Sequence, residues 1–346
     1  MTDLYAARWR GQPGRLEVWY ATLTDPDSGL GLWIHHELVA RTDGSTKLHG
    51  WATAFVPGER PVSARFGPVD VAAVDASHLA DPDGPGEVTG GEDLASRAYV
   101  RMGVVSAGPD RLQGEAGALR WRLQVRNGGE PLFPFPRWSW RNELLPAAQV
   151  VPSPTATFSG EVHVGDRVFR LGEAGGAVSR IYGHGNASRW GWLHADLGGG
   201  DVLELVAAVS ARPGLRHLPP LPLLQLRAGG RDWPRSPLLA APLLRARLDQ
   251  PEWSVWGVVG RRRVRIHVVQ DPGDSVTMQY ENPDGRGPVC VNSERASAEV
   301  LVERWSGRWA VEHHWHLDHT AHAEIGFTTP HQNTSPGSSL KGQPCL

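Results

Sequence analysis

Short segments of alternating apolar and polar residues recur along the chain, and turns rich in glycine and proline separate them. Residues 15–23 and 30–40 flank the turn at 25–29 and predict a β-hairpin. Further strands are predicted at residues 47–56, 66–74, 98–105, 111–114, 118–125, 156–164, 167–171, 202–209, 253–259, 263–270, 275–281, 299–305 and 309–317. Because strand follows strand, the pattern predicts an all-β protein with little helix.

Two segments depart from this pattern. Residues 238–248 are the best candidate for a helix, although Pro242 limits its length. Residues 213–237 are rich in proline and leucine, and we expect them to form a long crossover without regular structure.

The most unusual alternation lies at residues 182–197 in the middle of the chain. Read as a strand, this segment places two tryptophans, two histidines, an asparagine, a serine and an aspartate on one face. These residues are His184, Asn186, Ser188, Trp190, Trp192, His194 and Asp196. Neither a solvent-facing strand nor a core-facing strand normally has this mixture, whereas the wall of an apolar cavity with a few placed polar groups does. The segment is therefore the leading candidate for an active or binding site.

The length of 346 residues favours two domains, each with its own core. Combined with the strand pattern, it predicts two β-barrels or sandwiches in tandem, packed together. We place the first in residues 1–175 and the second in residues 176–330, and we expect a disordered tail at residues 331–346.

Composition excludes several classes of function. The net charge is −2 without a basic block, which argues against nucleic acid as a partner. The two cysteines provide no disulfide framework or thiolate metal site, and no dinucleotide, phosphate-loop or nucleophile-elbow motif occurs, so no cofactor is predicted. Residues 1–10 lack the apolar segment of a secretory signal, and no apolar run reaches about 18 residues. We expect a cytoplasmic protein without an integral membrane segment.

Three segments resemble a known family. Glu17-Val18-Trp19-Tyr20 resembles the Glu-Trp-Trp-Tyr box of AttH-type proteins, the lipocalin-like family that includes carotenoid 1,2-hydratases (hydroxyneurosporene synthases). Residues 183–192, with Gly183-His184-Gly185-Asn186 and Trp190-Gly191-Trp192, resemble the central segment of those proteins. Residues 290–300 are more loosely similar to the C-terminal part of tocopherol cyclases. The sequence departs from the family at Val18, where the family has Trp, and at Gly183, where the family has an acidic residue before the central His.

The resemblance implies two lipocalin-like (calycin) barrels in tandem and an activity on large apolar molecules, such as hydration, cyclisation or intramolecular Diels–Alder reactions. If the family's acidic residue before the central His is the acid catalyst, another group supplies that acid here or the chain has none.

These observations lead to a specific hypothesis for the site. The protein is predicted to be a cofactor-independent cyclase, hydratase or isomerase of a terpenoid or polyketide, working by general acid catalysis in a tryptophan-lined cavity at the junction of the barrels. His184, His194 or Asp196 would supply a proton with Asn186 orienting it, and the ligand would contact Ser188, Trp190, Trp192, Tyr182, Trp19, Trp33, His35, Glu37 and His316. A non-catalytic carrier of hydrophobic ligands remains the main alternative, and a structural protein of a membrane or envelope complex is a third possibility.

Two other clusters were considered. Five of the 15 histidines lie within residues 313–322, where His314 and His316 have a spacing known from metal sites, but the sequence supplies no third ligand, so no metal is predicted. Arg261, Arg262, Arg263 and Arg265 form a small basic patch, which leaves contact with phosphate or a membrane surface as an alternative to simple solvation.

Overall fold

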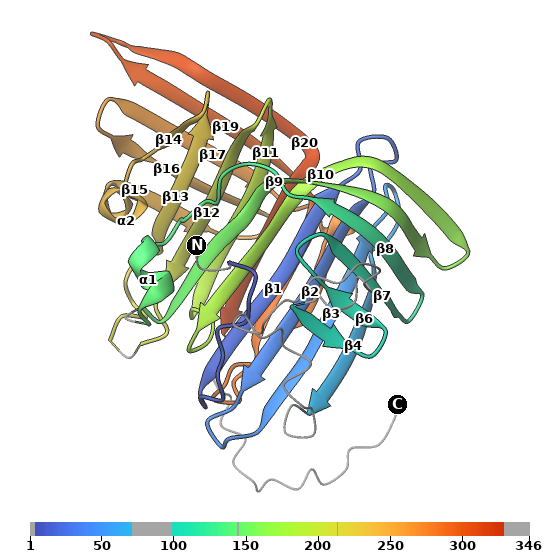
Figure 1. The fold of residues 1–346 in the computed structure, drawn as a ribbon. Coiled ribbons are helices and arrows are strands. Elements are labelled where there is room, and N and C mark those ends of the chain that lie inside the picture. Colours follow the sequence, from blue (N-terminus) through green and yellow to red (C-terminus); the bar gives the residue numbers. More distant parts are fainter. Residues whose placement is uncertain (1–3, 71–98, 144, 213, 329–346) are drawn as a thin grey trace, which may run out of the picture.

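The computed structural model describes residues 4–70, 99–143, 145–212 and 214–328. These residues form two antiparallel ten-stranded sheets that lie against each other (Figure 1). The prediction of an all-β protein built from two tandem barrels is confirmed.

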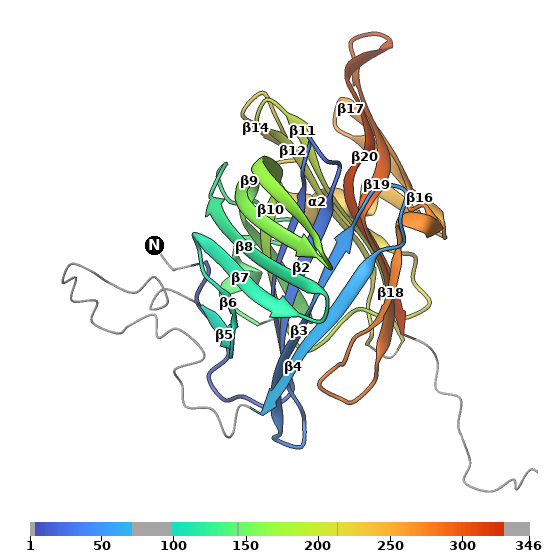
Figure 2. The same ribbon diagram turned by 90° about the vertical axis from the view of Figure 1, so that its right-hand side faces the viewer.

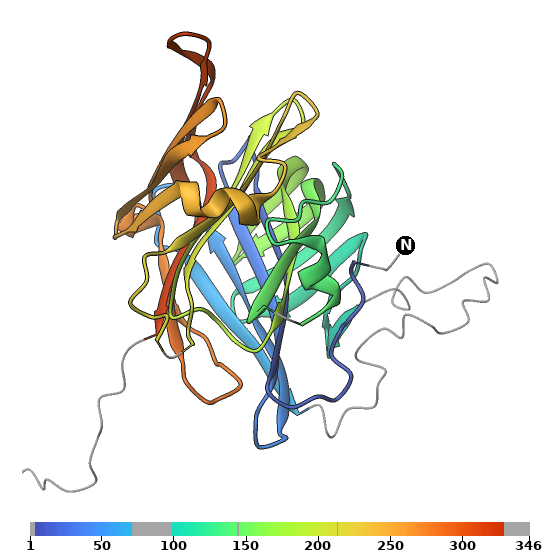
Figure 3. The same ribbon diagram turned by 90° about the vertical axis from the view of Figure 1, so that its left-hand side faces the viewer.

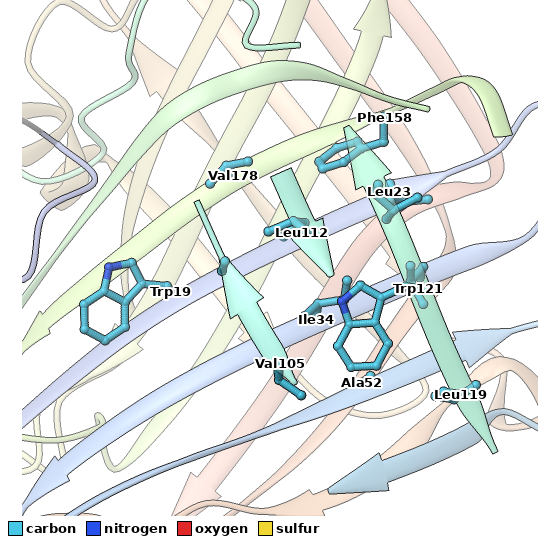
Figure 4. Packing of buried hydrophobic residues seen from close by; sticks show 14 of the residues in the cluster. Trp19, Leu23, Ile34, Ala52, Val105, Leu112, Leu119, Trp121, Phe158 and Val178 are labelled. Carbon is cyan, nitrogen blue, oxygen red and sulfur yellow. The ribbon is translucent and has the colours of Figure 1, made fainter. Parts of the chain in front are cut away.

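The first sheet has the strand order β4-β3-β2-β1-β10-β9-β8-β7-β6-β5. Its strands are β1 Arg15–Thr24, β2 Gly31–Ala40, β3 Thr46–Phe55, β4 Val62–Asp70, β5 Val100–Met102, β6 Val105–Ala107, β7 Arg111–Ala116, β8 Leu119–Arg126, β9 Ala147–Val164 and β10 Arg167–Gly183. Strand β4 contacts β5, β7 and β8 at the opposite end of the sheet, so the sheet nearly closes into a barrel. Its interior holds a large apolar core, part of which is shown in Figure 4.

The second sheet has the order β14-β13-β12-β11-β20-β19-β17-β16-β15, with β18 paired to β19. Its strands are β11 Arg189–Gly198, β12 Asp201–Val209, β13 Leu221–Ala228, β14 Arg231–Trp233, β15 Leu244–Leu248, β16 Glu252–Val259, β17 Arg262–Val269, β18 Val276–Gln279, β19 Pro288–Trp305 and β20 Trp309–Thr328. It encloses a second apolar core. The tip of the long β19–β20 hairpin projects beyond the rest of the sheet (Figure 3).

The central strands of the first sheet are buried on both faces. On β1, Trp19 belongs to the core of the first barrel, whereas Val18 and Tyr20 belong to a separate apolar cluster shared with the second sheet. On β11, Leu193 faces the core of the second barrel while Trp190 and Trp192 join the shared cluster. Figure 2 shows the two sheets on either side of this contact. Alternate residues of each strand therefore pack into the core of one barrel, and the residues between them pack into the interface between the two sheets.

A buried ion pair ties the N-terminal segment to the first barrel. Glu17 on β1 and Arg180 on β10 are both fully buried and bonded to each other. The Arg180 guanidinium also donates to the carbonyl oxygens of Leu4 and Ala6, and the Glu17 carboxylate accepts from the backbone N–H of Arg8 at 2.8 Å. Burial raises the pKa of Glu17, although the Arg180 charge opposes that shift. Removing either residue would therefore leave the other as a buried charge without its partner.

The few helices are short: α1 Arg137–Arg141, α2 Pro237–Ala240, and the 3₁₀ turns η4 Ala241–Leu243 and η5 Pro272–Asp274. The helix predicted at residues 238–248 was wrong in its second half, which forms β15. The crossover predicted at residues 213–237 was also wrong, because β13 and β14 occupy much of it. In the part of the chain that the structure describes, no helix is both long and apolar enough to cross a membrane.

The first sheet ends at Gly183 and the second begins at Arg189, so residues 184–188 connect them. The boundary placed between residues 175 and 176 falls inside β10. The tail expected at residues 331–346 lies outside the described residues.

His36 on β2 should make the fold sensitive to acid. Burial and the neighbouring His35 lower its pKa to about 3, so it stays neutral in the folded chain at pH values where the unfolded chain binds a proton. The free energy of unfolding should therefore fall as the pH drops below about 6.5, by up to about 1.4 kcal/mol per pH unit from this residue.

Urea unfolding of the wild type and of His36→Leu at several pH values between neutrality and acid would measure this effect. The variant should show a shallower loss of stability, while His163→Ala, which alters a more exposed histidine, should keep the wild-type slope. An unchanged slope in His36→Leu would contradict the prediction.

Candidate active site

A pocket lies between the two sheets, outside the cores of both barrels. Its empty volume is about 850 Å³ when the open solvent at its mouth is included. Strands β1, β2, β9 and β10 of the first sheet and β11, β12 and β20 of the second sheet provide its walls. Its polar lining residues are Tyr20, His35, Glu37, Gln149, Asn186, Tyr280 and Glu324, and most of the others are apolar.

The indoles of Trp190 and Trp192 form the wall contributed by β11. Trp190 pairs with Gly326 on β20, where an added Cβ would collide with the Trp190 ring. Only glycine leaves room for the indole to lie across the neighbouring strand. The absence of a side chain at this position therefore sets the orientation of one wall of the pocket.

Glu324 on β20 is a partly buried carboxyl group that lines this pocket. Its Oε1 accepts a hydrogen bond from Trp190 Nε1 at 2.6 Å, and its Oε2 accepts one from the Tyr280 hydroxyl at 3.0 Å. Burial raises the pKa of Glu324, although these two donors favour its charged form. The carboxyl group thus keeps its proton to higher pH than an ordinary glutamic acid.

Glu37 on β2 lines the same pocket but has the opposite shift. Burial alone would raise its pKa, yet the two neighbouring imidazoles of His35 and His49 outweigh burial and hold the pKa of Glu37 below its usual value. Each imidazole has its Nε2 atom 3.6 Å from Glu37 Oε2. His35 also stacks on Tyr280, with 5.3 Å between ring centroids, so this group is linked to the residue that bonds Glu324.

A third buried carboxylate, Glu204 on β12, lies behind the tryptophan wall. Its Oε1 accepts hydrogen bonds from Trp192 Nε1 and from Gln149 Nε2, both at 2.7 Å, and its Oε2 lies 2.9 Å from His194 Nδ1. Gln149 also donates to the Tyr20 hydroxyl at 2.8 Å. This network joins side chains of both sheets and fixes Trp192, Gln149 and Tyr20 around the pocket.

The network continues deeper into the interface. The His194 ring stacks on His322, and His322 Nδ1 lies 2.5 Å from Glu294 Oε2. Thr22 on β1 donates a hydrogen bond to the same carboxyl group. Burial raises the pKa of Glu294 well above its usual value and lowers that of His322 well below its own, so the interface favours the neutral form of each group.

Comparison with known proteins assigns the chain to a family. The family model for tocopherol cyclase-like proteins matches residues 120–327.

The chain belongs to the tocopherol cyclase-like family.

Two relatives are uncharacterized proteins of Mycobacterium tuberculosis, from strains CDC 1551 and H37Rv; each is 45% identical over 322 residues, which cover 92% of this chain and 88% of the relative.

Solved structures share the fold of this family member at low sequence identity. An AttH protein of Nitrosomonas europaea has a TM-score of 0.57 at 13% identity and covers 90% of this chain and 92% of its own. CghA with Sch210972 has a TM-score of 0.55 at 12% identity, covering 96% and 97%. Kievitone hydratase of Nectria haematococca has a TM-score of 0.52 at 10% identity, covering 95% and 93%. Membership of a cyclase-like family supports the interpretation of the chain as an enzyme.

The structure brings together some of the residues that the sequence proposed for the site. Those that line the pocket of this cyclase-like protein are Trp33, His35, Glu37, Asn186, Trp190 and Trp192. The backbone N–H and the side-chain amide of Asn186 both donate to Asn282 Oδ1 at 2.9 Å. His194 is fully buried behind the wall and contacts Glu204.

Other proposed residues lie elsewhere, and for His184 and Ser188 the reason is that the predicted continuous strand is interrupted at residues 184–188. His184 is exposed beside Arg15, Ser188 donates to the backbone of Val209, and Asp196 accepts from the Gly198 N–H at the end of β11. Trp19 belongs to the core of the first barrel, Tyr182 packs with Trp140 in a separate cluster, and His316 is exposed on β20. None of these six lines the pocket.

Sequence reasoning did not single out Glu324, Tyr280, Gln149 or Glu204 as site residues. A usable signal exists for Glu204, which stands in the middle of the apolar segment 202–209, since a charged residue in such a strand needs a buried partner. Glu324 pairs with Trp192 across the sheet, but this register depends on β20 returning beside β11. No local pattern reveals that pairing.

Proposed function

We propose that the protein is a cyclase or hydratase that adds an O–H bond across a carbon–carbon double bond of an apolar substrate. One observation carries the proposal: two carboxyl groups with opposite pKa shifts, Glu324 and Glu37, line one pocket walled by aromatic rings. Paired groups whose environments separate their pKa values are typical of acid–base catalysis. The names of the family and of kievitone hydratase agree with this reaction class.

In the first step, Glu324 transfers its proton to one carbon of the double bond, and the other carbon becomes cationic. The π electrons of the alkene form the new C–H bond, and Glu324 becomes a carboxylate. The faces of Trp190 and Trp192 stabilise positive charge in a water-poor site, and the carboxylates of Glu324 and Glu37 add electrostatic attraction.

In the second step, an oxygen atom attacks the cationic carbon and forms the C–O bond. If the oxygen belongs to a hydroxyl group of the same substrate the product is a ring, and if it belongs to water the product is an alcohol. Its proton passes to the Glu37–His35 pair, and solvent exchange returns a proton to Glu324. No net proton is consumed.

The remaining polar residues position the reacting groups. Glu204 accepts the hydrogen bond that orients Trp192, and Gln149 donates the one that orients Tyr20. His194 contacts Glu204 from the side away from the pocket. Asn186 is positioned by its hydrogen bonds to Asn282. The mostly apolar lining favours a hydrophobic small molecule that carries an alkene. A prenylated phenol satisfies this description, since it presents both the double bond and the internal hydroxyl group.

Incubation with a panel of prenylated hydroquinones and linear isoprenoid alcohols in D₂O tests the proposal. The expected product carries one carbon-bound deuterium that is retained after transfer to H₂O, because the proton donated to the alkene derives from solvent through Glu324. Mass spectrometry distinguishes a cyclised product from a hydrated one.

Matched tryptophan substitutions provide the control. Val206→Trp fills the pocket and should abolish labelling, whereas Val258→Trp on the exposed face of β16 should leave it unchanged. Tight binding of panel members without deuterium transfer would overturn the enzyme proposal in favour of a carrier.

A further inference from the structure

We propose that the outer face of the second barrel holds a site for a first-row transition-metal ion, formed by Glu299, His314 and His316. One ligand atom of each residue lies within 4.8 Å of those of the other two, and all three side chains are exposed. This site is separate from the pocket between the sheets.

Strand pairing accounts for the arrangement. His314 and His316 are two residues apart on β20 and so share one face, and their ring centroids are 4.1 Å apart. Glu299 on β19 is the direct cross-strand partner of His316. The neighbouring residues Ala298 and Val300 point into the core of the second barrel, so Glu299 projects outward beside both imidazoles.

The ligand atoms are already near coordination distance of one another. His314 Nε2 lies 2.7 Å from Glu299 Oε1. Tetrahedral zinc, with bonds of about 2.0–2.1 Å, requires ligand atoms about 3.3 Å apart. Small rotations of exposed side chains bring the three atoms to that separation, and no buried group has to move.

The donor set identifies the class of ion. Two imidazole nitrogens and one carboxylate oxygen suit Zn²⁺, Ni²⁺ or Cu²⁺, whereas Mg²⁺ and Ca²⁺ prefer oxygen ligands only. Glu299 also lines a shallow hollow on the outer face with Trp256 and Arg265, which leaves space for a water molecule on the ion. Because the ligands come from both strands of the projecting β19–β20 hairpin, a bound ion would cross-link these two strands.

Calorimetric titration of the chelator-treated full-length chain with ZnCl₂ tests the site. One equivalent of Zn²⁺ is expected to bind, and His316→Ala and Glu299→Ala should each weaken binding by at least about 10-fold. His163→Ala is the matched control, because His163 lies 3.7 Å from Glu161 on the first sheet but has no second histidine in that pair. This control should bind Zn²⁺ as the wild type does.

Thermal unfolding with and without Zn²⁺ gives a second readout, with a rise in the midpoint expected for the wild type and for His163→Ala only. Absence of stoichiometric uptake, or uptake that is unchanged in a His314→Ala/His316→Ala double variant, would overturn the proposal. Because the ligands are exposed, circular dichroism should show native folding in every variant.

Discussion

Replacing Glu324 with Gln should reduce turnover by about 10²–10⁴-fold while leaving ligand affinity almost unchanged. Glutamine keeps the size of the side chain. Its amide oxygen can still accept the hydrogen bond from Trp190, and its amide nitrogen can donate to the Tyr280 hydroxyl oxygen, but it has no acidic proton to give to an alkene. Steady-state deuterium incorporation from D₂O measures turnover, and quenching of tryptophan fluorescence by the same substrate measures binding.

The pH profile separates a chemical role from a structural one. Because the pKa of Glu324 is raised, wild-type turnover should persist to higher pH than an ordinary glutamic acid would allow and fall as the pH rises through that pKa. Glu37→Gln should lose turnover as well but should remove the decline on the acid side, where an ionised Glu37 is needed. Glu161→Gln, which changes an exposed glutamate, should behave as the wild type. Full activity in Glu324→Gln would exclude this residue as the acid.

Replacing Arg180 with Leu should destabilise the fold by about 3–5 kcal/mol, because Glu17 would remain buried without its counter-charge. The carbonyl oxygens of Leu4 and Ala6 would also lose their donor. Urea unfolding followed by tryptophan fluorescence measures the difference in the free energy of unfolding.

A double-variant cycle gives this prediction its control. Glu17→Leu/Arg180→Leu should be less destabilised than the sum of the two single variants, since removing both charges also removes the desolvation penalty. Strictly additive losses would show that Glu17 and Arg180 contribute independently. The result bears on the family box as well, because Glu17 opens that motif and the structure gives it a fold-stabilising contact.

The strands themselves follow from local patterns that the sequence displays. Residues 190–195 alternate as predicted, with Trp190 and Trp192 on one face and Leu193 and Ala195 on the other, because the period of two is a property of the backbone. The prediction for β13 failed because the prolines of residues 213–237 indicated a crossover. Pro222 is tolerated where β13 pairs with β12, since β14 reaches only residues 226–228.

The site was only partly predictable, for a different reason. The proposed acid and base come from β20 and β2, which belong to different sheets and line the same pocket. His184 was proposed on the assumption that one strand runs through residues 182–197, but the chain leaves the first sheet at Gly183. Alternation within a strand predicts which side chains share a face of the sheet. The contacts between the two sheets depend on the order of the strands, which no short segment of sequence contains.

The short connection at residues 184–188 has a consequence for how the active centre is assembled. Each sheet pairs its own first strand with its own last strand, β1 with β10 and β11 with β20, so each half of the polypeptide is topologically self-contained. The pocket between them thus corresponds to an inter-subunit site enclosed within one polypeptide. If the two halves were separate polypeptides, the pocket would exist only in their heterodimer and in neither partner alone. The five-residue connection instead keeps the two halves at a high effective concentration relative to each other.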